Sequence, residues 1–402
     1  MTASGHSLTQ KSRIAAHVAT LPKSGIRKFF DLVAQTKGVI SLGVGEPDFD
    51  TPWHISRAAV TCLENGGTHY TSNLGTIELR KAIAGYLERR FSVNYCWENQ
   101  ILACVGVSEA IDLAIRALCS PGDEIIYHEP CFVSYAATIR LAHAIPVAVE
   151  TSANNDFKLT VEALEKKVSP KTKALLINFP CNPTGATLDA AEMEAILEFA
   201  ERHDIIILAD EVYAELIYDC DASKPLTGFA SFPRYRDRVV LLNGFSKAWA
   251  MTGYRLGFAA GPADIIDAMM KIHQYGIMSA PTLSQAAGTE AMNYGDRDVD
   301  RMRREYCKRR DFLVPALNNL GLKTFMPKGA FYIFPDIRST GMTSEEFALR
   351  LLNDHSVACV PGTAFGKCGE GFVRMSYATS LDKIKVAAER IAEMVLNLPK
   401  FL

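Results

Sequence analysis

One stretch of the chain decides its fold class: Ile205-Ile206-Ile207-Leu208-Ala209-Asp210-Glu211-Val212-Tyr213. Its first five residues are apolar and mostly branched, which is typical of a strand that is buried on both faces of a parallel sheet. The strand then ends in two carboxylates. A lone acid at a strand end is usually a helix cap, but Asp210 leaves a dry core with a charge that needs a cationic partner.

Six further apolar runs predict the other strands of the same sheet: Ile101–Val105, Glu124–Tyr127, Ile145–Val149, Lys173–Asn178, Val239–Leu242 and Leu256–Ala260. Helical patterns lie between them. In segments 108–119 and 188–203, apolar residues recur every three or four positions. Strands that alternate with helices predict an α/β fold, a three-layer sandwich in which helices cover both faces of a mostly parallel, seven-stranded sheet.

The character of the sequence changes before residue 50 and after about residue 296. Asp296–Asp311 is densely charged, which could suggest nucleic-acid binding, but acids interrupt its basic residues, so we expect a solvated helix that joins two domains. Shorter strand and helix patterns follow and predict a smaller α+β domain. We therefore expect an N-terminal arm that forms part of the small domain at 1–50, a large cofactor-binding domain at 51–295 and a C-terminal small domain at 296–402.

The composition argues against several functions. With 43 Lys and Arg against 45 Asp and Glu, the chain has no broad basic field for nucleic acid or anionic lipid. Its apolar runs are far shorter than the ~18 residues that a membrane-spanning helix needs, and residues 1–21 lack the apolar stretch of a secretory signal. The ten cysteines form no CxxC pair. We expect a cytoplasmic protein with reduced thiols and with neither a nucleic-acid nor a membrane partner.

Several familiar binding motifs are incomplete. Gly43–Asp48 begins like a dinucleotide fingerprint, but an acid stands at its third glycine position. Gly362–Lys367 has too few residues between its glycines for a P-loop, and Gly244–Ala248 lacks the second glycine of a nucleophile elbow. No two of the nine histidines lie closer than eleven residues, so no local ligand pair exists and we expect no metal site.

Polar residues follow several predicted strands, at the edge where open α/β sheets bind ligands. Asn182-Pro183-Thr184-Gly185 follows one strand, and Ser246-Lys247 follows another, with Arg255 eight residues further on. An amine beside an arginine suits imine formation next to a bound anion. The turn Gly106-Val107-Ser108-Glu109 offers free N–H groups and a hydroxyl to a phosphate. Each motif alone has a simpler reading as a turn or a solvated side chain, but together with Asp210 they fit one cofactor.

That cofactor is pyridoxal 5′-phosphate, which needs a lysine, a carboxylate for its pyridine nitrogen and a phosphate-binding turn. The chain also resembles the fold-type I aminotransferases of class I/II, and within them the bacterial and archaeal aspartate/aromatic-type branch. The matching stretches follow one order along the sequence: Leu42–Phe49; His69–Thr71 with Gly75 and Glu78–Arg80; Asn182–Gly185; Asp210–Tyr213; Phe245–Ala248; Gly253–Gly257; and Pro361–Gly362 with Phe372–Tyr377. Several motifs in one order are far more specific than any single motif.

The resemblance implies a role for each residue of this set. Lys247 becomes the Schiff-base lysine that also shuttles the substrate proton, and Asp210 keeps the pyridine nitrogen protonated. The catalytic residues would be Lys247, Asp210 and Tyr213. Cofactor binding would involve Val107, Ser108, Ser246 and Arg255 at the phosphate, Asn182 and Tyr213 at the 3′ oxygen, Phe132 against the ring, Asp210, Lys247, and Tyr70 from a neighbouring subunit. The alternative for Phe132 is an ordinary core residue.

The resemblance also implies the reaction and the partners. Arg374, with Asn182 and the Gly43 backbone, would hold the substrate α-carboxylate, and Tyr70 implies a homodimer with shared active sites. We expect ping-pong transfer of an amino group between an amino acid and a 2-oxo acid such as 2-oxoglutarate. The alternative is a carbon–sulfur β-lyase or a related eliminating enzyme. Val107 and Ser108 stand where some aspartate-using relatives carry a lysine, so aspartate, aromatic, alanine-like and diaminopimelate-type donors stay open.

Overall fold

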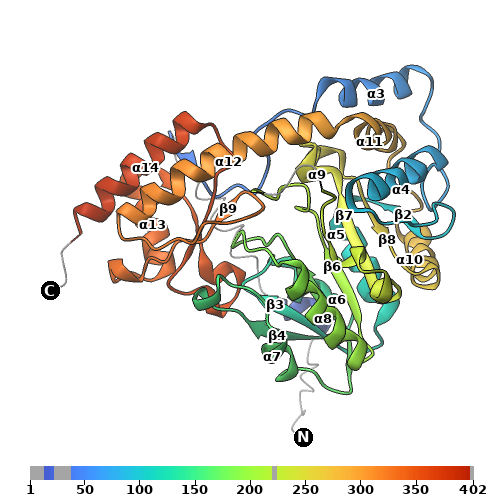
Figure 1. Cartoon of the computed structure of the whole chain (residues 1–402), viewed down its shortest axis with the longest axis horizontal. Coiled ribbons are helices and arrows are strands. Elements are labelled where there is room, and N and C mark those ends of the chain that lie inside the picture. Colours follow the sequence, from blue (N-terminus) through green and yellow to red (C-terminus); the bar gives the residue numbers. More distant parts are fainter. Residues whose placement is uncertain (1–12, 22–37, 220–223, 399–402) are drawn as a thin grey trace, which may run out of the picture.

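A seven-stranded sheet forms the centre of the computed structural model, which describes residues 13–21, 38–219 and 224–398 (Figure 1). The strand order is β2-β8-β7-β6-β5-β3-β4. The strands are β2 (Ile101–Cys104), β3 (Glu124–Glu129), β4 (Ile145–Glu150), β5 (Thr172–Asn178), β6 (Ile206–Asp210), β7 (Val239–Gly244) and β8 (Gly257–Ala260). The predicted α/β class and the seven strands are confirmed, with ends that differ by one or two residues.

All neighbouring strands of this sheet are parallel except at β8, which is antiparallel to both β2 and β7. Between β7 and β8 the chain forms only the short helices α9 (Phe245–Ala248) and η4 (Thr252–Tyr254). Because Gly244 pairs with Gly257, this connection stays at the edge where β7 ends and does not cross a face of the sheet. The next strand must then run in the opposite direction.

Helices cover both faces of the sheet and complete the three predicted layers. Along β6, the side chains of Ile207 and Ala209 enter one core, and Leu208 enters the other, as the period of two residues in a strand requires. Helices α3 (Trp53–Glu64), α4 (Ile77–Phe91), α7 (Val161–Glu165), α8 (Ala190–Arg202) and α11 (Thr282–Tyr294) contribute to the first core. Helices α5 (Gly106–Leu118), α6 (Ser134–Leu141) and α10 (Ala263–Gly276) contribute to the second.

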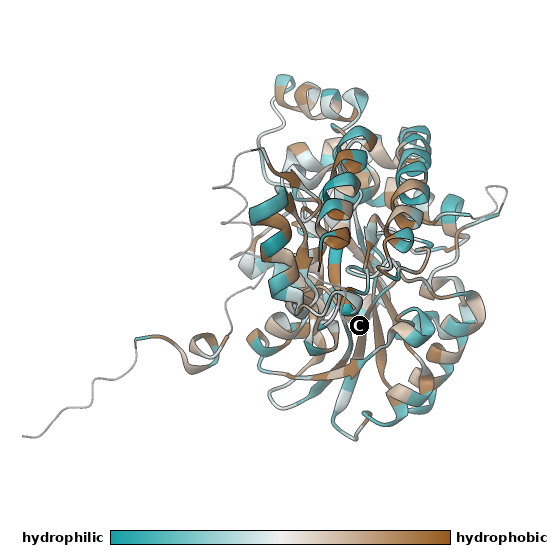
Figure 2. Cartoon of the chain, turned by 90° about the vertical axis from the view of Figure 1, so that its left-hand side faces the viewer, coloured by the Kyte–Doolittle hydropathy of each residue, from teal (hydrophilic) through white to brown (hydrophobic). Residues whose placement is uncertain are grey.

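The C-terminal part forms a smaller α+β unit, as predicted (Figure 1). Its helices are α12 (Asp296–Asn319), α13 (Ser344–His355) and α14 (Leu381–Leu396), with outward hydrophilic and inward hydrophobic stripes (Figure 2). Strands β9 (Tyr332–Ile333), β11 (Val360–Pro361) and β12 (Val373–Ser376) pair antiparallel, and β1 (Ile40–Ser41) pairs in parallel with β10 (Val357–Ala358). The N-terminal segment thus joins the C-terminal part. Domain boundaries at residues 50 and 295 stay a prediction.

The remaining elements are short. They are α1 (Ala16–Ala19) and the 3₁₀ helices η1 (Ala153–Asn155), η2 (Phe229–Ser231), η3 (Pro233–Arg238), η5 (Arg338–Thr340), η6 (Gly362–Phe365) and η7 (Lys367–Gly369). Among the described residues, no helix combines the length and the apolar character that would let it cross a membrane.

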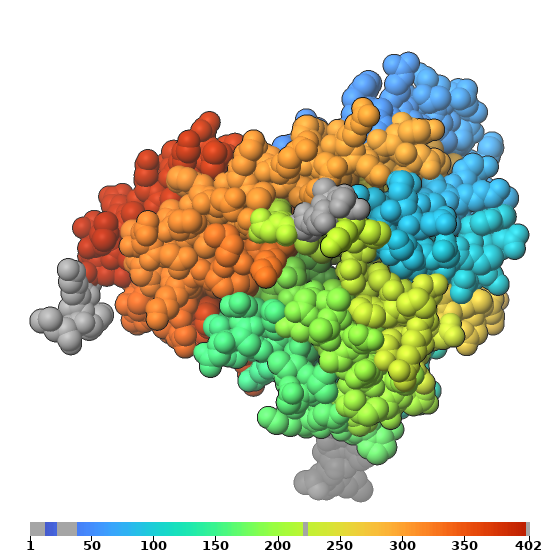
Figure 3. Space-filling model, viewed as in Figure 1, coloured from blue at the N-terminus to red at the C-terminus, as the bar shows by residue number. Residues whose placement is uncertain are grey.

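Helix α12 contains the charged run, and its surface extends from the C-terminal part to the N-terminal helices (Figure 3). Its solvation is only partial, which corrects the prediction of a solvated helix. Arg309 and Arg310 are only 4% and 3% exposed. Nη1 of Arg309 donates to Asp48 at 2.7 Å, and Nη1 of Arg310 donates to Asp219 at 2.9 Å. These two arginines therefore bind acids from distant parts of the sequence, which charge patterning alone does not reveal.

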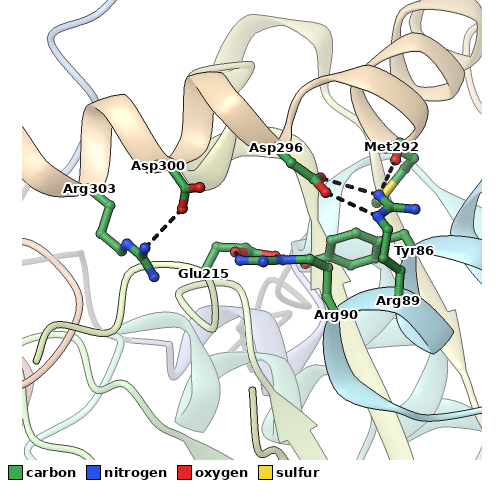
Figure 4. Close-up of polar contacts among 8 residues, drawn as sticks. All are labelled: Tyr86, Arg89, Arg90, Glu215, Met292, Asp296, Asp300 and Arg303. Atoms are coloured by element: carbon green, nitrogen blue, oxygen red, sulfur yellow. Dashed lines mark hydrogen bonds and ion pairs between the residues drawn. The ribbon is translucent and has the colours of Figure 1, made fainter. Parts of the chain in front are cut away.

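Helix α4 ties α12 to the loop that follows β6 (Figure 4). Glu215 in this loop accepts hydrogen bonds from Tyr86 Oη at 2.8 Å and from Arg90 Nη2 at 2.6 Å. One residue earlier on α4, Arg89 Nε donates to Asp296 in the first turn of α12 at 3.0 Å. Two adjacent arginines thus hold two segments that lie far apart in the sequence.

Removing the cation from the Arg90–Glu215 pair, whose carboxylate is buried, should destabilise the protein strongly. The Arg90→Met variant leaves the Glu215 carboxylate, which is 4% exposed, without its cation; we expect a loss of about 3–5 kcal/mol in the free energy of unfolding. Urea unfolding at one fixed protein concentration measures it. The control is Arg116→Met, which breaks the exposed Arg116–Asp112 pair and should cost less than about 1 kcal/mol. Equal losses in both variants would contradict the expectation.

Candidate active site

A cavity of about 410 Å³ opens where β5, β6 and β7 end. Ten of the twelve predicted site residues line it: Val107, Ser108, Phe132, Asn182, Asp210, Tyr213, Ser246, Lys247, Arg255 and Arg374. The carbonyl oxygen of Gly43 lies beside it and accepts from Arg374 Nη2 at 2.5 Å. Tyr70 is 83% exposed and borders a separate surface hollow with Ile277, so within one chain it does not reach this cavity.

Lys247 lies in the short helix α9, directly after β7, and its amine reaches the cavity. Its Nζ donates to the Gly45 carbonyl oxygen at 2.7 Å. Burial lowers the pKa of Lys247 to about 8; Glu46 opposes this shift, and the cations of Arg374 and Arg255 add to it. Part of the Lys247 population is therefore a neutral amine near pH 7, which is the form that attacks a carbonyl carbon.

Asp210 ends β6 inside the protein, where it is 5% exposed. Tyr135 Oη of α6 donates to its Oδ2 at 2.5 Å, and the backbone N–H of Val212 donates to Oδ1 at 3.3 Å. Burial raises the pKa of Asp210 to about 6, although both hydrogen bonds and the Lys247 cation oppose this rise. Within the described ranges, no cation forms an ion pair with this carboxylate, so a bound cationic group would stabilise its ionised form.

Asn178, the last residue of β5, joins three parts of the site and was not among the predicted site residues. Its Nδ2 donates to the Asp210 carbonyl oxygen at 2.8 Å, and its Oδ1 accepts from the Asn182 backbone at 2.9 Å. Its own N–H lies 3.3 Å from Nε2 of buried His128. Burial lowers the pKa of His128 to about 4, so the ring is neutral at pH 7 and Nε2 can accept. The only signal in the sequence was its place at a strand end.

Arg374 is 3% exposed, so a buried cation stands at the small-domain side of the cavity. Nη1 donates to Asn182 Oδ1 at 2.9 Å, and the guanidinium carbon lies 4.7 Å from the ring centre of Tyr332. The Nε atom has no hydrogen-bond partner among the described residues. Burial lowers the pKa of Arg374, yet arginine stays charged at neutral pH. Because the partners of this buried cation among the described residues are all neutral, an anionic ligand would stabilise it.

Tyr332 is a second residue that the sequence analysis missed. Its hydroxyl lies 2.9 Å from that of Tyr213, and both rings are buried at the cavity wall. Tyr332 comes from β9 of the C-terminal part, whereas Tyr213 follows β6. The cavity is therefore built from both parts of the chain, and this pairing of two ordinary core aromatics carries no local sequence signal.

The turn between β2 and α5 also lines the cavity, through Val107 and Ser108. Gly106 has a φ of +74°, and a Cβ there would lie 2.6 Å from Arg255 Nη2. A Cβ on Gly257 would lie 2.6 Å from the backbone nitrogen of Val107. The guanidinium thus packs directly on the turn, and α5 starts there with free backbone N–H groups. Helix start and arginine together suit a phosphate.

These groups fit pyridoxal 5′-phosphate by their chemistry. Lys247 offers an amine, Asp210 a carboxylate without a cation, and Arg255 with the α5 start an anion-binding turn. Arg374 remains for a second anion, such as a substrate carboxylate.

Known proteins share this fold and sequence pattern. The family model described as "Aminotransferase class I and II" matches residues 37–391. The putative aminotransferase YugH of Bacillus subtilis is 50% identical over 94% of this chain and 97% of its own length. An aspartate aminotransferase of Pyrococcus abyssi is 46% identical, covering 92% and 95%. The crystal structure of an aromatic aminotransferase from Pyrococcus horikoshii OT3 superposes with a TM-score of 0.87 at 43% identity, covering 92% of this chain and 98% of that chain.

The electrostatics of the cavity predict how Glu46 acts on Lys247. Because the Glu46 carboxylate raises the pKa of Lys247, the Glu46→Gln variant should lower that pKa further below about 8 and enlarge the neutral fraction at pH 7. Competitive acetylation of the cofactor-free protein across a pH series, read by peptide mass spectrometry, measures the Lys247 titration. Exposed Glu389→Gln on α14 is the matched control. An unchanged or higher Lys247 midpoint in Glu46→Gln would contradict the expectation.

Proposed function

The chain belongs to the class I and II aminotransferases, which are pyridoxal-phosphate-dependent enzymes, and we propose that it moves an α-amino group between an amino acid and a 2-oxo acid by ping-pong exchange through Lys247. One observation carries the proposal: a single cavity holds a partly buried amine of lowered pKa, a buried carboxylate and a buried arginine, and among the described residues neither the carboxylate nor the arginine has a partner of opposite charge. When bound, the cofactor supplies an aldehyde that condenses with amines and a ring that takes up electrons from the substrate Cα.

Lys247 would act twice, first as the amine that holds the cofactor and then as the base for the substrate. Its Nζ would take the proton from the substrate Cα and return it to the cofactor side. A pKa of about 8 suits both tasks, because the amine is partly neutral near pH 7 and still basic enough to take a proton. The Nζ hydrogen bond to Gly45 keeps the amine directed into the cavity.

Asp210 would hold the pyridine nitrogen in its protonated form. Its pKa of about 6 reflects the cost of burying a charge, and a cationic ring nitrogen would remove that cost. Tyr135 and the Val212 backbone orient the carboxylate. Asn182 and Tyr213 would donate to the 3′ oxygen of the ring, and Phe132 would stack on its face.

The two anions of the reaction would bind at different groups of the cavity, one at the Gly106 turn beside Arg255 and one beside Arg374. Val107, Ser108, Ser246 and Arg255 would hold the cofactor phosphate. Arg374, oriented by Asn182 and the Gly43 carbonyl, would hold the substrate α-carboxylate through its unpartnered Nε and its Nη groups. This separation would fix the substrate Cα near Lys247, between the two anchors.

A homodimer with shared active sites would complete the site. Tyr70 is 83% exposed and Tyr275 on α10 is 88% exposed. Large exposed aromatics of this kind are enriched at protein interfaces. Tyr70 of one subunit would then reach the phosphate of its partner.

The described cysteines are free thiols, which agrees with the expected cytoplasmic location.

An aromatic amino donor is favoured over aspartate. The cations that line the cavity in the described part of the chain are Lys247, Arg255 and Arg374, and each already has a role. Within one subunit a distal carboxylate would meet no further cation there, and this holds for the 2-oxoglutarate acceptor as it does for an aspartate donor, so both would draw on a group from the partner subunit. Ile111 and Tyr332, in contrast, offer apolar contact to an aromatic donor. The acceptor would be a 2-oxo acid such as 2-oxoglutarate.

The first test is the reaction itself. The full chain loaded with pyridoxal 5′-phosphate should consume 2-oxoglutarate and an aromatic amino acid. It should form one glutamate for each aromatic oxo acid produced. Borohydride reduction should attach the cofactor to the peptide with Lys247, and Lys247→Ala should show neither attachment nor turnover. Release of pyruvate with ammonia or a thiol, without new amino acid, would favour the β-lyase instead. Attachment in the Lys247→Ala protein would overturn the lysine assignment.

The Asp210→Ala variant measures the role of the buried carboxylate. Removing one member of a buried ion pair costs about 3–5 kcal/mol, and each ~1.36 kcal/mol of barrier is about tenfold in rate. We therefore expect kcat to fall roughly a hundred- to several-thousandfold, as measured by steady-state kinetics. Asp210→Glu keeps the charge and should lose less. A kcat for Asp210→Ala within about tenfold of the unmodified enzyme would contradict this role.

A further inference from the structure

A pair of titratable side chains, a buried histidine and a partly buried glutamate, supports the phosphate-binding turn from behind. His273 of α10 is fully buried, and its Nδ1 lies 2.8 Å from Oε1 of Glu109 on α5. The other carboxylate oxygen, Oε2, accepts from the backbone N–H of Val105 at 2.5 Å. Val105 is the residue before Gly106, where the turn into α5 begins. None of the roles proposed above uses Glu109 or His273.

The hydrogen-bond directions follow from the groups involved. An ionised Glu109 can only accept, so Nδ1 of His273 carries the proton and donates it. Nε2 of His273 has no partner among the described residues. The arrangement therefore gives both oxygens of this partly buried carboxylate a donor, which offsets the cost of removing them from water.

The position of Glu109 makes this pairing necessary for an anion site. Glu109 directly follows Ser108, whose N–H and hydroxyl would bind the phosphate. A second negative charge turned toward that place would repel the phosphate. Because the bonds to Val105 and His273 occupy both oxygens, the carboxylate points away from the cavity, and it lines none of it.

The turn is thus held on two sides. Arg255, which lies just before β8, and the backbone of Gly257, the first residue of β8, contact the turn from one side. The contacts are close, since a Cβ on Gly106 or Gly257 would lie 2.6 Å from the nearest atom. Glu109 and His273 hold it from α5 and α10. A turn held on one side only could shift by tenths of an ångström, and hydrogen bonds to a phosphate depend on such distances.

We propose that Glu109 and His273 form a positioning pair that fixes the turn at Val105–Ser108, so that the protein selects the phosphorylated cofactor over its unphosphorylated form. The inference deepens the proposed function, since it rests on the assignment of Val107 and Ser108 to the phosphate. The pair acts through the backbone and touches neither cofactor nor substrate.

The test compares two ligands that cannot condense with Lys247: pyridoxamine 5′-phosphate and pyridoxamine. Calorimetric titration of the full-length, cofactor-free protein gives a Kd for each, and their ratio reports the contribution of the phosphate. In Glu109→Met and in His273→Leu, the preference for the phosphorylated ligand should fall about ten- to hundredfold, the range that loss of hydrogen bonds to a charged group produces. The affinity for pyridoxamine should stay nearly unchanged.

Matched variants separate positioning from general destabilisation. His273→Asn keeps an N–H donor near the Nδ1 position and should restore most of the preference. Lys271→Ala breaks an exposed ion pair with Asp267 on the same helix and should leave the ratio unchanged. Glu109→Asp, which keeps the charge but shortens its reach, should lose part of the preference and serves if Glu109→Met does not fold.

The outcomes separate the positioning pair from the assignment of the phosphate site. An equal loss of affinity for both ligands, or an unchanged ratio in Glu109→Met, Glu109→Asp and His273→Leu, would overturn the positioning pair while the proposed function stands. An unmodified protein that binds both ligands equally would overturn the phosphate assignment itself, and this inference with it.

Discussion

The Asp210 carboxylate ends strand β6 inside the protein, only 5% exposed, and no described cation forms an ion pair with it. A buried charge of this kind is costly unless something compensates for it. Part of the cost appears in the pKa of Asp210, which burial raises to about 6. Tyr135 and Val212 hold the carboxylate in place, in a position that suits the cationic ring nitrogen that we propose it binds. The remaining polar groups of the cavity are arranged around this one position.

The charges of the cavity are not balanced. Lys247, Arg255 and Arg374 line it, against Asp210 and Glu46. An excess of positive charge in a partly buried cavity attracts anions, and here the cations stand at different places. Arg255 packs on the turn at Gly106, whereas Arg374 lies beside Asn182 and Gly43. Two separate anions fit such a site better than one, and a cofactor phosphate with a substrate carboxylate meets this requirement.

The sequence predicted the sheet and most of the site because both have local signals. Continuous apolar runs marked the strands, and polar residues directly after them, such as Asp210 and Lys247, marked the edge where the cavity lies. The direction of β8 was harder to predict. This strand is antiparallel because the chain from Gly244 stays at one edge of the sheet, and no residue pattern encodes that path. The burial of Arg374 has no local signal, because an arginine is usually exposed unless it is paired.

Three residues of the site were missed for another reason: their roles depend on contacts with distant parts of the sequence. Tyr135, Asn178 and Tyr332 act through contacts with residues 75, 32 and 119 positions away. Tyr135 lies in the pattern of an ordinary amphipathic helix, and Tyr332 in a short apolar strand. A buried tyrosine contributes its ring to the core whether or not its hydroxyl has a task, so composition and periodicity cannot separate the two cases.

The same arrangement recurs behind two of the strand ends at the cavity, those of β6 and β2. The loop after β6 is held by Glu215 against Tyr86 and Arg90 of α4, and Asp210 itself is held by Tyr135 of α6. The turn after β2 is held by Glu109 against His273 of α10. In all three, a helix that covers the sheet sends a polar side chain to the loop. Apolar packing resists separation of helix and sheet but sets position only loosely, whereas a hydrogen bond between buried groups fixes both distance and direction. A reaction that needs one amine, one carboxylate and two anion sites at set positions therefore depends on these helices as much as on the strands.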